Sequence, residues 1–179
     1  MIAKISSDID PREFATDRRP RSCPACESVS ANQIGDKRGF DWLRCLDCGT
    51  LYVSTLPTAA SRMHYETGVY YNDENLDVPG FVTSRLKEIV KSFARYRQTN
   101  RLLDVGCGAG TLLNVANQAG WNAEGVELSV PTVDILRKQG LTVFPGELAQ
   151  AKFPEAHFDV VTAAELLEHV PDPSSLIAE

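Results

Sequence analysis

The stretch Arg101-Leu-Leu-Asp104-Val-Gly106-Cys-Gly108-Ala-Gly110-Thr-Leu-Leu113 decides the fold. Its first residues predict a short buried strand over about 101–105, and the apolar run after Gly110 predicts a helix over about 110–119. Glycines at every second position between them allow a tight turn and a close approach of the backbone to a ligand. The start of such a helix offers unpaired N–H groups to a negative ligand group. The stretch therefore predicts a nucleotide-like ligand on an α/β fold.

The chain on either side of this stretch alternates between helical and extended patterns. Further strands are predicted at about 122–127, 141–144 and 158–163, and further helices at about 81–97, 130–139 and from Asp172-Pro173 onward. The helix over 81–97 would bury the face formed by Val82, Leu86, Ile89 and Phe93. Ser129 is the expected N-cap of the helix that follows it. This alternation predicts a parallel sheet with right-handed crossovers.

Composition limits the classes of protein to consider. The chain has 179 residues, 43% of them hydrophobic, which suits one domain with a small appendage. The net charge of −6 gives no electrostatic reason to expect nucleic acid as a partner, and Arg18-Arg-Pro-Arg21 is interpreted as a solvated linker. No apolar run approaches the ~20 residues of a membrane span, and the N-terminus has no signal-peptide pattern. We therefore expect a cytoplasmic protein that works neither on nucleic acid nor in a membrane.

Four of the five cysteines form the pairs Cys23-Pro-Ala-Cys26 and Cys45-Leu-Asp-Cys48, with 18 residues between the pairs. This spacing predicts a zinc site with four thiolate ligands, while iron, redox-active dithiols and free thiols are the alternatives. A site filled by four cysteines has no position open for water, so its role would be structural, as a scaffold or a lid on the substrate side. Recognition of a partner is the alternative role. Cys107 is interpreted as a small residue of the glycine turn.

The glycine turn and three later segments resemble a known family. The turn reads G-x-G-x-G with Asp104 upstream and Thr111 where a dinucleotide-binding turn would have glycine or alanine. Glu127 follows Gly106 by 21 residues, and Gly146-Glu147-Leu148 follows the next predicted strand. The segment Phe158-Asp-Val-Val-Thr-Ala-Ala-Glu165-Leu-Leu-Glu168-His169-Val-Pro-Asp-Pro173 completes the series. In order and spacing, residues of about 80–179 resemble class I S-adenosylmethionine-dependent methyltransferases.

The resemblance implies a Rossmann-like parallel sheet and a role for each matching residue. Asp104 would hold the turn, and Gly106, Gly108 and Gly110 would approach the methionyl part of S-adenosylmethionine. Glu127 would bind the ribose, Leu128 would pack against the adenine, and Glu147 and Leu148 would flank the adenine.

His169 is the candidate base for removing a proton from the methyl acceptor. It is predicted just beyond the carboxyl end of a strand, where ligands bind in open α/β sheets, and its unperturbed pKa of ~6.5 suits proton transfer near neutrality. Glu165 and Glu168 complete a Glu-x-x-Glu-His pattern, which in a ubiquinone-biosynthesis branch of the family is associated with a divalent metal. The alternative interpretation makes the two glutamates surface charges of a helix.

The expected organisation is a flexible arm (1–21), a zinc ribbon (22–56), a connector (57–80) with a helix near 58–66, and the N-terminal part of a methyltransferase domain (81–179). Two short strands are predicted within the zinc ribbon, at 40–44 and 50–53. Tyr70 and Tyr71 in the connector would reach the ligands or pack locally. This arrangement resembles a bacterial group that includes methyltransferases of nucleotide-linked deoxysugars. The expected acceptor is therefore a small molecule, with a nucleotide-linked sugar as one candidate.

The resemblance stops inside the helix after the fourth strand of the family's sheet. We therefore expect a fragment or a truncated product, in which the bare apolar edge of the strand at 158–163 would invite self-association. Two alternative functions remain, a zinc-binding adaptor without enzymatic activity and a nicotinamide-dependent oxidoreductase. The second offers no role for the Glu-x-x-Glu-His segment.

Overall fold

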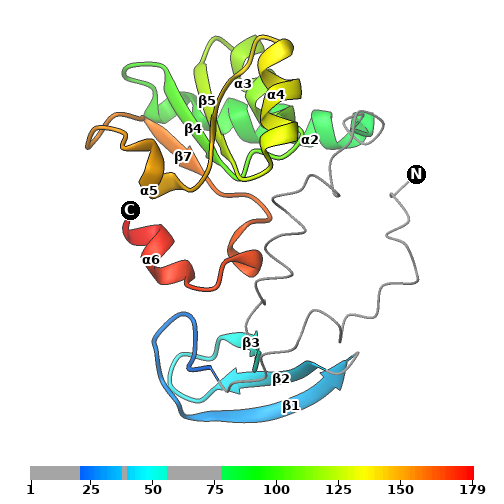
Figure 1. The fold of residues 1–179 in the computed structure, drawn as a ribbon, viewed down its shortest axis with the longest axis vertical. Helices are drawn as coiled ribbons and strands as arrows, with labels where there is room; N and C mark the ends of the chain where they lie inside the picture. Colours follow the sequence, from blue (N-terminus) through cyan, green and yellow to red (C-terminus); the bar gives the residue numbers. More distant parts are fainter. Residues whose placement is uncertain (1–20, 38–39, 56–77) are drawn as a thin grey trace. The chain divides into compact units, whose positions relative to one another are not determined.

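The computed structural model describes residues 21–37, 40–55 and 78–179. They belong to two compact units, one within His64–Leu167 and the other made of N-terminal residues together with Glu168–Glu179. Figure 1 shows both, with the parallel sheet in green to orange and the strands of the smaller, cysteine-containing unit in blue to cyan. The helix expected near 58–66, and Tyr70 and Tyr71, lie outside the described residues.

The larger unit contains a four-stranded parallel sheet with the order β6-β5-β4-β7. Its strands are β4 (Arg101–Val105), β5 (Asn122–Glu127), β6 (Thr142–Pro145) and β7 (Val160–Thr162). The chain first adds strands on one side of β4 and then places β7 on its other side. This reversal creates a switch point at the carboxyl end of β4, the place where open α/β sheets bind ligands. The predicted α/β fold with a Rossmann-like parallel sheet is confirmed.

Helices α2 (Gly80–Ser92), α3 (Thr111–Gln118) and α4 (Val130–Lys138) cover the sheet, and their buried side chains join those of β4, β5 and β6 in one core cluster. A 3-10 turn, η2 (Phe93–Tyr96), extends α2, and a short helix, α5 (Leu148–Ala151), follows β6. Ser129 caps α4, as predicted, because its side chain accepts a hydrogen bond from the Thr132 amide. Gly120 and Gly140 follow α3 and α4 with φ angles of +84° and +86°, the left-handed geometry expected where a helix ends.

The buried face of α2 differs slightly from the predicted one. Val90 is its most buried residue at 1% exposure, and Leu86 and Phe93 pack against the core beside it. Ile89, which the sequence pattern assigned to this face, is 37% exposed. The apolar stripe is therefore rotated toward Val90.

The smaller unit is built on an antiparallel sheet with the order β1-β2-β3. Strands β2 (Phe40–Cys45) and β3 (Leu51–Val53) were predicted, whereas β1 (Ala31–Lys37) was not. Cys23, Cys45 and Tyr52 form its small core. A 3-10 turn, η3 (Leu167–His169), leads into this unit from the larger one, and the short helix α6 (Pro173–Ala178) follows. Among the helices of the described segments, none has both the length and the apolar character that a membrane span requires.

Candidate functional site

The glycine turn joins β4 to α3 and is fixed to the neighbouring strand. The amides of Gly106 and Cys107 both donate to the carbonyl of Val126, at 2.8 and 3.1 Å. Gly106, Gly108 and Gly110 have φ angles of +72°, +50° and +68°, a region that side chains disfavour. A Cβ at Gly106 would lie 2.8 Å from Cδ1 of Leu166, so that position also lacks space for a side chain. The sequence thus folds into a backbone cradle at the carboxyl end of the sheet.

Glu127 connects this cradle to the next helix. Its Oε2 accepts a hydrogen bond from the Gly108 amide and its Oε1 accepts one from the Ser129 amide, both at 2.9 Å. The side chain is only 8% exposed. A carboxylate has about four lone-pair sites, so two remain after these bonds. Glu127 therefore shapes the turn and can still accept two hydrogen bonds from a ligand.

Asp104 lies behind the turn, at the end of β4. Burial, the dominant effect, raises the pKa of its carboxyl group to about 6, with a further rise from the charge of Glu127. The hydroxyl of Thr162 on β7 donates to Oδ1 of Asp104 at 2.7 Å, which opposes the rise. Two buried acids thus stand at the same end of the sheet. Their charges favour a ligand that carries positive charge.

Cys107 is a packing residue, in agreement with its interpretation from the sequence. It is 8% exposed, and burial raises the pKa of its thiol. A Cβ built at Gly125 on β5 would lie 2.7 Å from its Sγ. Gly125 therefore makes room for Cys107, a contact that sequence reasoning missed because the two residues are brought together only by strand pairing.

The segment after β6 approaches the same end of the sheet. The Gly146 amide donates to the carbonyl of Glu127 at 2.9 Å, which brings the following residues toward the end of β5. Glu147 is exposed, and its side chain caps α5 in a reciprocal arrangement with Gln150. Glu is not among the preferred N-cap residues, so the spacing Glu147-x-x-Gln150 does not announce this capping box in the sequence. Leu128 and Leu148 are half-buried.

The Glu-x-x-Glu-His segment follows β7. Glu165, Glu168 and His169 are all exposed, and His169 ends the 3-10 turn η3. Glu165 has a φ of +52°, which marks a sharp turn of the backbone after the strand. The boundary between the two units runs between Leu167 and Glu168.

The four cysteines predicted to act together do gather in one place. Their sulfur atoms all lie within 4.8 Å of one another, and among the described residues they form the group able to hold a metal ion. Two of the separations, Cys23 to Cys48 and Cys26 to Cys45, are 3.6 Å. Hydrogen bonding to Thr50, chiefly through its side chain, lowers the pKa of Cys48 to about 6. The cluster is thus close-packed and contains a thiol that ionises readily.

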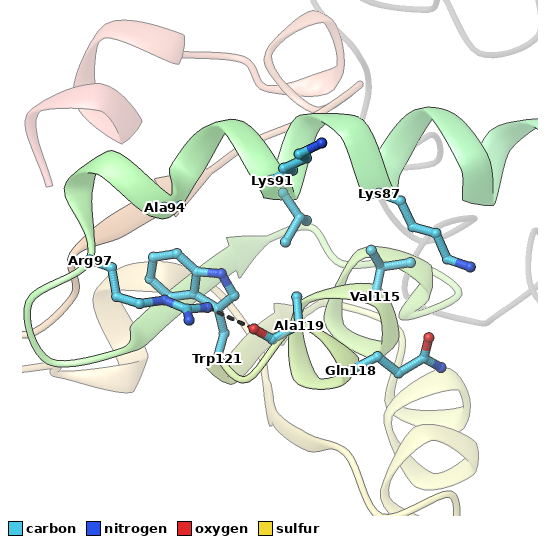
Figure 2. Close-up of a pocket in the computed structure, with 9 residues that line it drawn as sticks. Lys87, Lys91, Ala94, Arg97, Val115, Gln118, Ala119 and Trp121 are labelled. Atoms are coloured by element: carbon cyan, nitrogen blue, oxygen red, sulfur yellow. Dashed lines mark hydrogen bonds between the residues drawn. The ribbon is translucent and has the colours of Figure 1, made fainter.

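A separate groove of about 450 Å³ lies between α2 and α3. Lys87, Lys91 and Arg97 line it above an apolar floor that includes Trp121. Figure 2 shows Arg97 over the indole of Trp121, at 4.4 Å from the ring centroid, with a 2.9 Å hydrogen bond to the carbonyl of Ala119. Arg97 thus caps the end of α3 and covers Trp121. Because Trp121 precedes β5, this groove lies at the opposite end of the sheet from the glycine turn.

Comparisons with known proteins agree with the geometry of the turn. The chain is 37% identical over 99 residues to the ubiquinone biosynthesis O-methyltransferase of Bordetella avium, with 50% of this chain and 40% of that protein covered. The protein of the same name from Methylococcus capsulatus is 41% identical over 85 residues, with 44% and 36% covered. The chain thus spans about 40% of the length of the first of these curated relatives.

A solved structure shares the fold. The magnesium protoporphyrin IX methyltransferase of Synechocystis, with bound S-adenosylmethionine, aligns with a TM-score of 0.50 and 20% identity, covering 67% of this chain and 68% of that one. Residues 78–179 match the family described as a methyltransferase domain, which is more than half of the sequence. With the glycine turn, the two buried acids and the strand order in place, the chain belongs to the class I S-adenosylmethionine-dependent methyltransferase family.

Proposed function

We propose that this chain carries the cofactor-binding part of an enzyme that transfers a methyl group from S-adenosylmethionine to a small-molecule acceptor. The observation that carries the proposal is the buried carboxylate of Glu127, which accepts hydrogen bonds from Gly108 and Ser129 and retains lone pairs toward the carboxyl end of the sheet. The two hydroxyls of a ribose are donors of the matching kind.

The residues around the turn fit this cofactor in shape and charge. Its sulfonium group is cationic, and Asp104 and Glu127 supply negative charge in a buried setting. Gly106, Gly108 and Gly110 would approach the methionyl part, because a backbone with no side chains leaves room for it. Leu128 and Leu148 would flank the adenine, and Glu147 would accept from its amino group.

When bound, S-adenosylmethionine supplies an activated methyl group, so the protein has mainly to orient the acceptor and take up its proton. His169 is proposed as the base that accepts this proton. Two features support the proposal: His169 ends the 3-10 turn η3, which follows β7 in the chain, and an imidazole is the side chain that most often serves as a general base. Glu165 and Glu168 would assist His169, either through their negative charge or by holding a divalent cation.

An oxygen acceptor has the stronger support, because both curated relatives are named as O-methyltransferases of ubiquinone biosynthesis. A nucleotide-linked sugar is the second acceptor class, suggested by the pairing of a four-cysteine module with a methyltransferase domain. A phenolic acceptor and a nucleotide-linked sugar differ in charge and size, so a panel containing both, assayed with the full-length protein, separates the two classes.

The four-cysteine cluster is proposed to hold one zinc ion with a structural role. Four sulfurs bound tetrahedrally at about 2.3 Å from zinc stand about 3.8 Å apart. Two of the separations here are 3.6 Å and all lie within 4.8 Å, so small movements would complete the site. Cys23 and Cys45 are buried at 1% exposure within the core of this unit, where a bound ion would support the folding of a very small hydrophobic core.

Calorimetric titration with S-adenosylhomocysteine tests the cofactor site. Glu127→Ala should weaken binding by on the order of 10- to 100-fold, as expected for lost hydrogen bonds to a charged group. Glu124→Ala changes the same residue type on the same strand and should bind like the wild type. A ligand analogue without ribose hydroxyls should bind the wild type weakly. Its affinity should be the same for Glu127→Ala as for the wild type.

The adaptor alternative predicts a folded, metal-loaded chain that binds neither S-adenosylhomocysteine nor its analogue. Equal losses on Glu127→Ala for the ligand and its analogue would instead refute the contact with the ribose. Metal analysis tests the cysteines separately. Cys26→Ser should abolish stoichiometric zinc binding, whereas Cys107→Ser should retain it, because Cys107 lies outside the cluster.

A further inference from the structure

The first cysteine turn contacts the segment that follows His169. The hydroxyl of Ser174 donates to the carbonyl of Pro24 at 2.9 Å, and Nη2 of Arg21 donates to the carbonyl of Pro171 at 3.2 Å. Pro24 lies inside the Cys-x-x-Cys turn. Both contacts belong to the same compact unit, and each joins residues 150 positions apart in the sequence.

The turn that carries Pro24 is held by its own hydrogen bonds and by the cysteine cluster. The Cys23 amide donates to the carbonyl of Ser28, and the Glu27 amide donates to the carbonyl of Cys23, both at 2.8 Å. The Cys23 side chain is buried and its sulfur lies 3.6 Å from that of Cys48. The position of the Pro24 carbonyl therefore depends on how the cysteines are held together.

Helix α6, in contrast, has little support of its own. It has six residues, none of them buried. A helix of this length is not stable in water by itself, because nucleation is costly. Asp172 caps it, accepting from the Ser175 amide at 3.0 Å and from the Ser175 hydroxyl at 2.6 Å. In addition, the Ser174 hydroxyl ties the helix to the carbonyl of Pro24 in the cysteine turn.

We infer that metal loading of the cysteine cluster fixes the segment Glu168–Ser174, with Ser174 and Arg21 as positioning residues. The four-cysteine module thereby acts on His169, which lies two residues before Pro171. This rests on the proposed functions of the cysteines and of His169. The module would then couple the metal to the orientation of the base, beyond stabilising its own fold.

Hydrogen exchange on the 179-residue chain tests this coupling. In the zinc-loaded protein, Ser174→Ala should speed exchange of the amides of α6 about fivefold, as expected for one lost hydrogen bond, and leave β1–β3 protected. Ser174→Thr keeps the hydroxyl and should restore protection. Ser84→Ala is the matched control, because the Ser84 hydroxyl bonds within α2, at 3.0 Å to the Gly80 carbonyl. Chelation should speed exchange in both α6 and the cysteine strands.

A second readout follows the imidazole itself. The proton resonance of His169 should shift on chelation and on Ser174→Ala, and should return in Ser174→Thr, while His157 in the larger unit should keep its shift. If chelation of a zinc-binding chain changes neither α6 exchange nor His169, the coupling is refuted and the metal site stands. If the wild type binds no metal, the metal site is refuted and the coupling with it.

Discussion

The hydroxyl of Thr162 on β7 lies 2.7 Å from Oδ1 of Asp104 on β4 and donates a hydrogen bond to it. The bond joins two neighbouring parallel strands at the end where the glycine turn begins. Asp104 is nevertheless poorly stabilised as an anion, because burial raises its pKa to about 6. Burial therefore makes the negative charge of Asp104 unfavourable in the ligand-free protein. A cationic ligand bound nearby would stabilise that charge.

Asp104→Asn should therefore stabilise the ligand-free protein at neutral pH. The pKa of the native carboxyl, about 6, exceeds the ordinary aspartate value of 3.8, so the native state binds more protons between those two pH values. Wild-type stability then falls as pH rises through that window, by about 3 kcal/mol for this group. The asparagine keeps an acceptor for Thr162 and does not ionise.

The measurement is chemical unfolding at pH 4 and pH 7.5. Asp104→Asn should raise the free energy of unfolding at pH 7.5 and leave it unchanged at pH 4. The variant should also bind S-adenosylmethionine more weakly than the wild type. A variant less stable than the wild type at pH 7.5 would show that Asp104 stabilises the turn as an anion.

Arg97→Ala should destabilise the larger unit from the opposite end of the sheet. The substitution removes the contact with the Trp121 ring and the hydrogen bond to the Ala119 carbonyl. The expected loss is about 1–2 kcal/mol, and the fluorescence of Trp121 should shift to longer wavelength as water reaches it. Trp42→Phe makes Trp121 the sole tryptophan of the two in the sequence, so the measurement is specific.

The neighbouring cation provides the control for this prediction. Arg95 stacks on Tyr96, which is 49% exposed, so Arg95→Ala should leave both stability and Trp121 emission nearly unchanged. Equal effects of the two substitutions would mean that the positive charge at this end of the sheet matters, and the specific packing on Trp121 does not.

Asp159 holds the loop that precedes β4, a role that the sequence did not predict. Its Oδ2 accepts from the amides of Gln98, Thr99 and Asn100, each at 2.8 Å. Although desolvation opposes the change, these hydrogen bonds lower the pKa of the carboxyl group. The stabilisation is present above the unfolded-state pKa and is lost as pH falls through the lowered native value.

Asp159→Ala should lower the thermal midpoint by several degrees at pH 7 and by progressively less in acid. Asp134→Ala, an exposed aspartate on α4, is the matched control and should have little effect at either pH. If Asp159→Ala lowers the thermal midpoint equally at all pH values, the effect comes from the packing of the loop and the charge of the carboxylate is not its cause.

Sequence reasoning succeeded where local patterns carry the structure. The apolar run at Arg101–Val105 and the strand Asn122–Glu127 were predicted with the observed bounds, and the glycines of the turn point to its geometry by themselves. Cysteine spacing predicted the cluster because metal ligation leaves a fixed spacing in the sequence.

It failed where a partner distant in sequence decides the outcome. Strand β1 has a largely exposed surface, with Ile34 53% exposed, so it shows no apolar alternation and is held by its ladder to β2. Likewise, the partners of Asp159 and Asp104 lie about 60 residues away along the chain. Such contacts follow from the topology of the sheet, so the residues near each aspartate in the sequence do not predict them.

Gly125→Ala should destabilise the larger unit, although the position lies in a regular strand. A Cβ there would lie 2.7 Å from Sγ of Cys107 and 2.9 Å from Cδ1 of Leu113, both members of the core cluster. Overpacking of this kind costs about 1–3 kcal/mol. Gly80→Ala is the matched control, since a Cβ at Gly80 meets nothing within 4 Å and alanine favours the start of α2.

A double-mutant cycle locates the cause of the Gly125→Ala effect. Cys107→Ala removes the sulfur that the new Cβ would meet, so the cost of Gly125→Ala should be smaller in the Cys107→Ala background. The measurement is the free energy of unfolding of the four proteins in urea. If Gly125→Ala lowers the free energy of unfolding equally in both backgrounds, the steric conflict is with Leu113. The space that Gly125 leaves for Cys107 would then contribute nothing to the stability of the glycine turn.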